Sequence, residues 1–113
     1  IAGYSADGKA NGTAASVRTV AEFFGLEDAL GWYPEVPVPA AALLRVHSLA
    51  EAAACAYDIR QDDARLRQSP ETFEKQRGNY PLRREFPAFT IDRTSPLSED
   101  QFETLRKLGF QIR

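Results

Sequence analysis

The run AAALLRVHSLAEAAACAY, residues 40–57, decides how this sequence is interpreted. It contains neither Gly nor Pro and is mostly alanine and leucine, which are strong helix formers. Its apolar residues recur at three- and four-residue steps, as they do along one face of a helix; they are Leu43, Val46, Ala50, Ala53 and Tyr57. The run therefore predicts a helix over residues 40–57 that forms the centre of the core.

The same run holds the only His and the only Cys of the chain. His47 and Cys55 would stand about 12 Å apart along a helix, too far for a nucleophile and its base. His47 and Glu51, one turn apart, could pair, but they make only half a metal site. We expect His47 to be a surface or hydrogen-bonded residue and Cys55 to fill the core. No catalytic, metal-binding or cofactor-binding residue is predicted, although carboxylates brought together from distant positions are left open.

Length and composition are those of an ordinary folded protein. The 113 residues fit one domain, and 43% are hydrophobic and 27% charged. A single cysteine excludes an intrachain disulfide, and no apolar run reaches the ~20 residues that span a membrane. The chain begins at Ile1 and contains no Met, which predicts a processed protein, an excised domain or a trimmed expression product. The compartment is left open, and an organelle or secretory route after removal of a targeting segment is one alternative.

The first third of the chain is predicted to be an arm, a helix and an extended connector. Residues 1–12 are polar and rich in glycine, which indicates a flexible arm before a single domain over residues 13–113. A helix is expected over residues 14–24, ended by Gly25. The three prolines of residues 32–39, WYPEVPVP, predict an extended connector. Trp32 and Tyr33 would then cover the core or form a contact surface.

The C-terminal half alternates helix and strand signals. Helices are expected over residues 58–67, 70–77 and 98–108, the last opening with a capping box of Ser98 and Gln101. Residues 86–92 and 110–113 are expected to be strands, and Pro87 favours an edge position for the first of them. The predicted fold is α+β and helix-rich, with four to five helices and a small two-stranded sheet near the C-terminus.

Charge is unevenly distributed along the chain. The net charge is −2, yet residues 60–93 carry eight Lys and Arg against six Asp and Glu. Because acidic residues are interleaved with the arginines, we interpret the segment mainly as a solvated surface with internal ion pairs. The alternative is a nucleic-acid-binding surface with Tyr80 or Phe86 as stacking residues. Its arginines would be Arg60, Arg65, Arg67, Arg77, Arg83 and Arg84.

With no catalytic set in the sequence, we predict a protein that acts by binding rather than by catalysis. The expected function is a non-catalytic protein–protein interaction domain or an accessory subunit of a larger assembly. Its partners would be other protein subunits, with nucleic acid as the alternative. The predicted contact residues are aromatic or arginine, types that are enriched in binding surfaces; they are Trp32, Tyr33, Tyr80, Arg83, Arg84 and Phe86.

Overall fold

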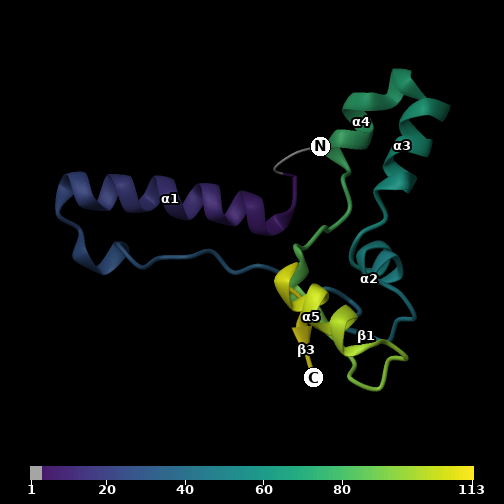
Figure 1. Cartoon of the computed structure of the whole chain (residues 1–113). Coiled ribbons are helices and arrows are strands. Elements are labelled where there is room, and N and C mark those ends of the chain that lie inside the picture. Colours follow the sequence, from purple (N-terminus) through teal and green to yellow (C-terminus); the bar gives the residue numbers. More distant parts are fainter. Residues whose placement is uncertain (1–3) are drawn as a thin grey trace. The chain divides into compact units, whose positions relative to one another are not determined.

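The computed structural model describes residues 4–113 and divides the chain into two compact units (Figure 1). The first, here called the N-terminal unit, extends to Pro37, and the C-terminal unit covers Val38–Arg113. Each unit is described by itself below. Within the described residues no helix is both long enough and apolar enough to cross a membrane.

The N-terminal unit is built on one long helix, α1, Ala6–Phe24. The helix begins at Ala6 because the Ser5 hydroxyl accepts a hydrogen bond from the Gly8 N–H group at 3.0 Å and so caps its first turn. It ends at Gly25, whose φ of 68° is the left-handed conformation expected of a glycine cap. Of the expected arm, residues 1–3 lie outside the described residues, and Ala6–Gly12 form the first turns of α1.

After Gly25 the chain turns back through the short 3₁₀-helix η1, Glu27–Ala29. Residues 32–39 have no helix or strand, as the three prolines predicted. The Tyr33 hydroxyl donates a hydrogen bond to the Asn11 side chain at 2.8 Å, which ties this segment to α1. The buried side chains of α1 are all small: Ala10, Ala14 and Ala21.

The C-terminal unit contains a three-stranded parallel sheet in the order β1-β2-β3. The strands are β1, Leu43–Leu44, β2, Thr90–Ile91, and β3, Gln111–Ile112. Leu44 pairs with Ile91, and Ile91 pairs with Ile112. The prediction that Pro87 places the strand of residues 86–92 at an edge is wrong. Pro87 lies in the 3₁₀-helix η3, Phe86–Ala88, and β2 begins beyond it as the central strand.

The helix predicted over residues 40–57 is also wrong in its first half. Only Leu49–Ala56 form a helix, α2, which begins after Ser48 because the Ser48 hydroxyl accepts from the Glu51 N–H group at 3.1 Å. The residues before it belong to the sheet instead. The carbonyl oxygens of Ala42 and Leu44 accept hydrogen bonds from the N–H groups of Thr90 and Asp92, at 2.7 and 2.8 Å respectively. Long-range pairing therefore overrides the local helix propensity.

Two further helices follow α2 and form a hairpin (Figure 1). They are α3, Ile59–Gln68, capped by Asp58, and α4, Phe73–Gly78, which continues from the 3₁₀-helix η2, Pro70–Thr72. The Gln76 side-chain amide holds the hairpin together, since it donates to the Ser69 carbonyl oxygen at 3.1 Å and to the Thr72 hydroxyl at 2.8 Å.

The last helix, α5, Glu99–Lys107, connects β2 to β3. The predicted capping box is confirmed: Ser98 Oγ accepts from the Gln101 N–H group, and the Gln101 side chain accepts from the Ser98 N–H group at 2.9 Å. Gly109 follows the helix with a φ of 104°, a conformation that side-chain-bearing residues rarely adopt. This turn sends the chain into β3.

The core of the C-terminal unit lies around the sheet and α5. Its buried members are Leu44, Val46, Ala52, Phe89, Ile91, Phe102, Leu105 and Phe110. Ile91, Val46 and Leu105 are its largest fully buried side chains. The predicted fold class, α+β and helix-rich with a small sheet near the C-terminus, is confirmed. The sheet gains a third strand, β1, from residues that were expected to be helical.

Candidate functional site

The six predicted contact residues belong to different units. Trp32 and Tyr33 lie in the N-terminal unit and are both exposed, while the other four lie in the C-terminal unit. Phe86 is half-buried and stacks on Phe110, with ring centroids 4.5 Å apart, so it supports the core. Arg83 and Arg84 are half-buried. That these residues contact a partner stays a prediction.

Tyr80 and Arg83 belong to a polar cluster centred on the carboxylate of Asp62, in the first turn of α3. The Tyr57 hydroxyl lies 2.9 Å from both carboxylate oxygens, and the Tyr80 hydroxyl donates to Oδ2 at 2.6 Å. Arg65 pairs with Oδ1 from one turn further along the helix. The Arg83 guanidinium lies over the Tyr57 ring, 5.1 Å from its centroid. The cluster joins the end of α2, the start of α3 and the segment after α4.

The cluster shifts the acidity of its members in opposite directions. Burial raises the pKa of the Tyr57 hydroxyl, and the hydrogen bonds with Tyr80 and Asp62 raise it further. Partial burial by itself would raise the pKa of the Asp62 carboxyl, but the hydrogen bonds from Tyr80 and Tyr57 and the charge of Arg65 outweigh it and lower that pKa. Asp62 is therefore held ionised and Tyr57 neutral at neutral pH.

This arrangement suits a structural anchor better than a proton-transfer site. A general base needs a free acceptor position facing a substrate, whereas Asp62 accepts from Tyr57, Tyr80 and Arg65. Asp62 and Tyr57 were missed as a pair by the sequence reasoning. Their five-residue spacing carries no standard motif, and Tyr80 joins them from 18 residues further along the chain.

His47 and Cys55, the two residues of the 40–57 run with the most reactive side chains, lie in different surroundings. His47 lies just before the Ser48 cap of α2, and its Nδ1 atom is 3.3 Å from Glu51 Oε2, as the expected pairing required. The expectation that Cys55 fills the core is wrong, since Cys55 is exposed on α2. Among residues 4–113 no group of three or more His, Cys, Asp or Glu side chains could hold a metal ion.

Most arginines of the basic segment are engaged with carboxylates, as the interleaved acids predicted. Ion pairs join Arg60 to Asp58, Arg67 to Asp63, Arg77 to Glu74 and Arg93 to Glu99, in addition to Arg65 with Asp62. Nearby carboxylates weaken the attraction of these arginines for phosphate groups. The segment therefore lacks the concentrated positive charge of a nucleic-acid surface.

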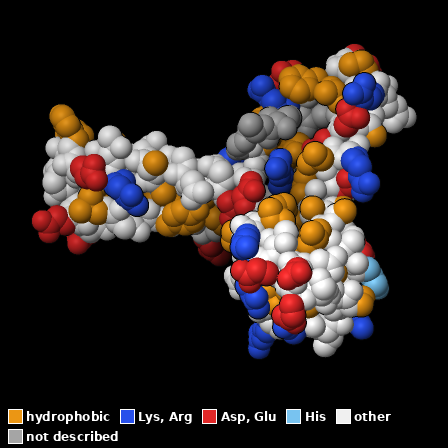
Figure 2. Space-filling view, in the orientation of Figure 1, with side chains coloured by type: hydrophobic (Ala, Val, Ile, Leu, Met, Phe, Trp, Pro, Cys, Tyr) orange, Lys and Arg blue, Asp and Glu red, His pale blue; other side chains and the backbone are white. Residues whose placement is uncertain are grey.

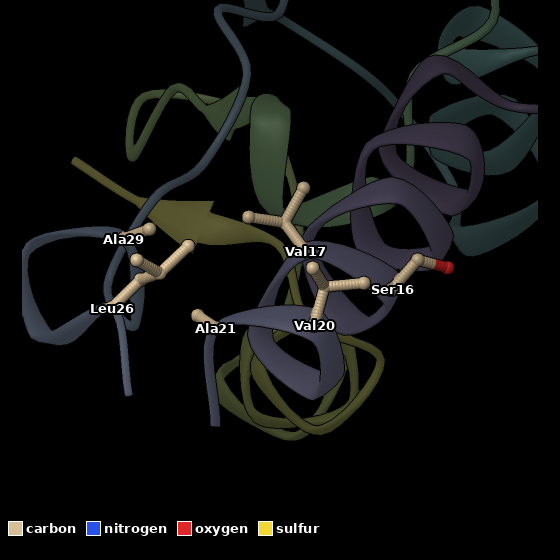
Figure 3. Close-up of a pocket in the computed structure, with 6 residues that line it drawn as sticks. All are labelled: Ser16, Val17, Val20, Ala21, Leu26 and Ala29. Carbon is tan, nitrogen blue, oxygen red and sulfur yellow. The ribbon is translucent and has the colours of Figure 1, made fainter. Parts of the chain in front are cut away.

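The N-terminal unit carries a hollow and exposed apolar side chains. The hollow, of about 250 Å³, is lined by Ser16, Val17, Val20 and Ala21 of α1 and by Leu26 and Ala29. Figure 3 shows the α1 side chains on one side of it and Leu26 and Ala29 on the other.

Large apolar side chains lie exposed beyond this hollow. Phe23 is 82% exposed and Phe24 67% exposed, and their rings pack edge to face. Figure 2 shows hydrophobic side chains at the surface along this unit.

Comparison with known proteins gives the family. Residues 35–109 match the protein family described as "Domain of unknown function (DUF3410)". The chain belongs to this family. The start of the DUF3410 match lies within three residues of the boundary between the two structural units, so the domain coincides with the C-terminal unit.

The DUF3410 chain is also similar to enzymes called erythronate-4-phosphate dehydrogenase. Those of Bacteroides thetaiotaomicron and Bacteroides fragilis are 44% identical over 91 residues, which cover 80% of this chain and 26% of each enzyme. That of Sodalis glossinidius is 31% identical over 122 residues, covering 100% of this chain and 32% of the enzyme. The chain thus spans about a quarter to a third of the length of these relatives.

These relatives correct the predicted function. A non-catalytic interaction domain or accessory subunit was expected, with nucleic-acid binding as the alternative, and both are wrong because the similar proteins are dehydrogenases. The prediction was based on the lack of a catalytic set within the 113 residues. That lack says little about an enzyme when the chain spans only 26–32% of the length of its relatives.

Proposed function

We propose that this chain is part of a dehydrogenase that acts on erythronate 4-phosphate. The observation that carries the proposal is 44% identity over 91 residues to two Bacteroides enzymes of that name. The similarity is not confined to the DUF3410 match, because the Sodalis enzyme aligns over the whole chain, including α1. Both structural units would therefore belong to the same enzyme.

The chain's own residues limit what this part of the enzyme contributes. Dehydrogenases commonly use a dinucleotide cofactor, whose phosphates bind a glycine-rich turn between a strand and a helix. The two loops that lead from strand to helix here, residues 45–48 and 92–98, contain no glycine. They do not fit such a cofactor. We therefore assign no step of the oxidation to these loops and place cofactor binding elsewhere in the proposed enzyme.

The electrostatics of the C-terminal unit support the same division. Erythronate 4-phosphate carries a phosphate and a carboxylate, and proteins bind such anions mainly through arginine and lysine. Arg60, Arg67 and Arg93 are already paired with neighbouring carboxylates. In the proposed enzyme these three arginines would have to leave their carboxylate partners before they could bind the substrate anion, so we do not assign that role to them.

The experiment is to express the complete reading frame that encodes these 113 residues and to assay oxidation of erythronate 4-phosphate with nicotinamide and flavin acceptors. We expect turnover by the complete product and none by the 113-residue chain alone. Erythronate without the phosphate is the control substrate and should be oxidised much more slowly. Failure of the complete, folded product to oxidise erythronate 4-phosphate with any of these acceptors would overturn the proposal.

A further inference from the structure

The hairpin of α3 and α4, with η2 between them, contributes no side chain to the core of the C-terminal unit. All of residues 57–85 are described, none of them is buried, and every member of the core lies outside this segment. The apolar side chains of Ile59, Leu66 and Phe73 are 62%, 41% and 39% exposed. Hydrophobic burial, the main stabilising contribution to a fold, therefore holds the hairpin only weakly. The half-buried residues within the hairpin are polar instead: Asp62, Ser69, Thr72 and Gln76.

Polar contacts join the two helices of the hairpin to each other. The Gln76 side-chain amide of α4 donates to the Ser69 carbonyl oxygen and to the Thr72 hydroxyl. It also donates to the Arg65 carbonyl oxygen of α3 at 3.3 Å. Because α3 has ten residues and α4 six, each helix would be only marginally stable by itself in water. We therefore expect the two helices to open together.

The Asp62 cluster joins the two ends of the hairpin at its base. Tyr57, which donates to Asp62, lies just outside α3 and follows Ala56, which packs against the core. Tyr80 donates to Asp62 from just beyond α4, and its ring centroid lies 5.9 Å from that of Tyr57. The Arg83 guanidinium, from the same segment, lies over the Tyr57 ring. These contacts hold the first turn of α3 to a part of the chain that the core fixes in place.

We infer that the α3–α4 hairpin opens as a separate unit and that the Asp62 cluster keeps it closed. Residues 59–78 unfold and refold together while the sheet and α5 stay folded. Proteins open in cooperative segments of this kind at free energies below that of global unfolding, and segments with few buried apolar contacts open most readily. The inference goes beyond the proposed function and does not depend on it, because it concerns how this part of the chain moves, whatever reaction the complete protein catalyses.

The test is amide hydrogen exchange in the complete reading-frame product, followed by mass spectrometry of peptides from the hairpin and from α5. Conditions are chosen in which exchange rates rise in proportion to hydroxide concentration, so that the rates report opening equilibria. Two variants separate the hairpin from the core. Tyr80→Phe removes a hydroxyl that donates to Asp62, and Ile91→Val removes one carbon from a fully buried side chain.

The two variants should change different sets of amides. Tyr80→Phe should speed exchange about tenfold in α3 and α4 alike, because a hydrogen bond to a charged group is lost. Ile91→Val should speed exchange of the slowest α5 amides about fivefold. It should leave the rates in the hairpin unchanged, because the core is folded both before and after the hairpin opens. In the protein without substitutions, the hairpin amides should exchange faster than the slowest α5 amides.

Three outcomes would overturn the inference. If Ile91→Val speeds exchange equally in the hairpin and in α5, the two open together as one cooperative unit. If Tyr80→Phe speeds exchange in only one of α3 and α4, the hairpin does not open as a unit. If Tyr80→Phe leaves both helices unchanged, the Asp62 cluster does not keep the hairpin closed. Tyr33→Phe, which removes an exposed hydroxyl from the N-terminal unit, is the control and should leave the hairpin rates unchanged. Asp62→Asn repeats the measurement in case Tyr80→Phe does not fold.

Discussion

The Asp62 cluster gives the sharpest quantitative prediction, through the substitution Tyr80→Phe. The change removes only the hydroxyl that donates to Asp62 Oδ2 at 2.6 Å and keeps the ring near Tyr57, where the two ring centroids lie 5.9 Å apart. A hydrogen bond to a charged group contributes about 1.5–3 kcal/mol to stability. Because Asp62 and Tyr80 are only partly buried, water can replace the lost donor in part. We therefore expect a loss near the lower end, about 1.5 kcal/mol.

The assay is urea unfolding of the 113-residue chain, followed by far-ultraviolet circular dichroism. For a chain of this size the free energy of unfolding falls by about 1–1.5 kcal/mol per molar urea, so the midpoint should fall by about 1 M. The matched control is Tyr33→Phe, which removes an exposed hydroxyl that donates to Asn11. An exposed hydrogen bond competes with water, so this control should change the midpoint by less than about 0.3 M. Equal effects of the two substitutions would refute the argument that the cluster anchors α3 to the segment after α4.

Three further predictions concern pH, the core and a turn. The folded-state pKa of the Asp62 carboxyl is lowered, so its contribution to stability should be present above its unfolded pKa, about 3.9, and be lost as the pH falls through the folded pKa. The urea midpoint should therefore fall as the pH is lowered from 6 to 2, and Asp62→Asn should make this fall less steep. An unchanged pH dependence in the Asp62→Asn variant would contradict the prediction. Leu105→Ala, at a fully buried position, should cost about 2–5 kcal/mol of unfolding free energy, whereas Leu108→Ala, at an exposed one, should cost much less. Gly109→Ala should cost about 1–2 kcal/mol, because φ is 104° and the new Cβ would lie 3.4 Å from Pro87 Cγ; a neutral effect on the thermal midpoint would show that the turn can relax.

Local signals in the sequence were sufficient where the structure depends on neighbouring residues. The capping box of Ser98 and Gln101 placed the start of α5, and Gly25 placed the end of α1. In both cases the groups that form the cap lie within a few residues of each other, so the pattern contains the whole interaction. The start of α1 was missed because the Ser5 cap stands in a stretch whose glycines indicated a loop.

Residues 40–57 show where local signals failed. Alanine and leucine favour a helix at each position, yet Leu43 and Leu44 form β1 because Thr90 and Asp92 offer N–H donors to this segment. The formation of β1 depends on pairing with a strand almost fifty residues away, and the hydrophobic periodicity of residues 40–57 contains no information about that partner. The Asp62 cluster was missed for the same reason, since Tyr80 joins it across the α3–α4 hairpin.

The sequence by itself determined the fold class, the caps of α5 and the extended proline segment, because each follows from backbone preferences and contacts a few residues apart. Only the tertiary structure decided that Leu43–Leu44 is a strand, that Cys55 is exposed and that Asp62 collects the hydroxyls of Tyr57 and Tyr80. Those features arise when segments far apart in the chain meet, and the free energy of that meeting is larger than the local preferences it overrides.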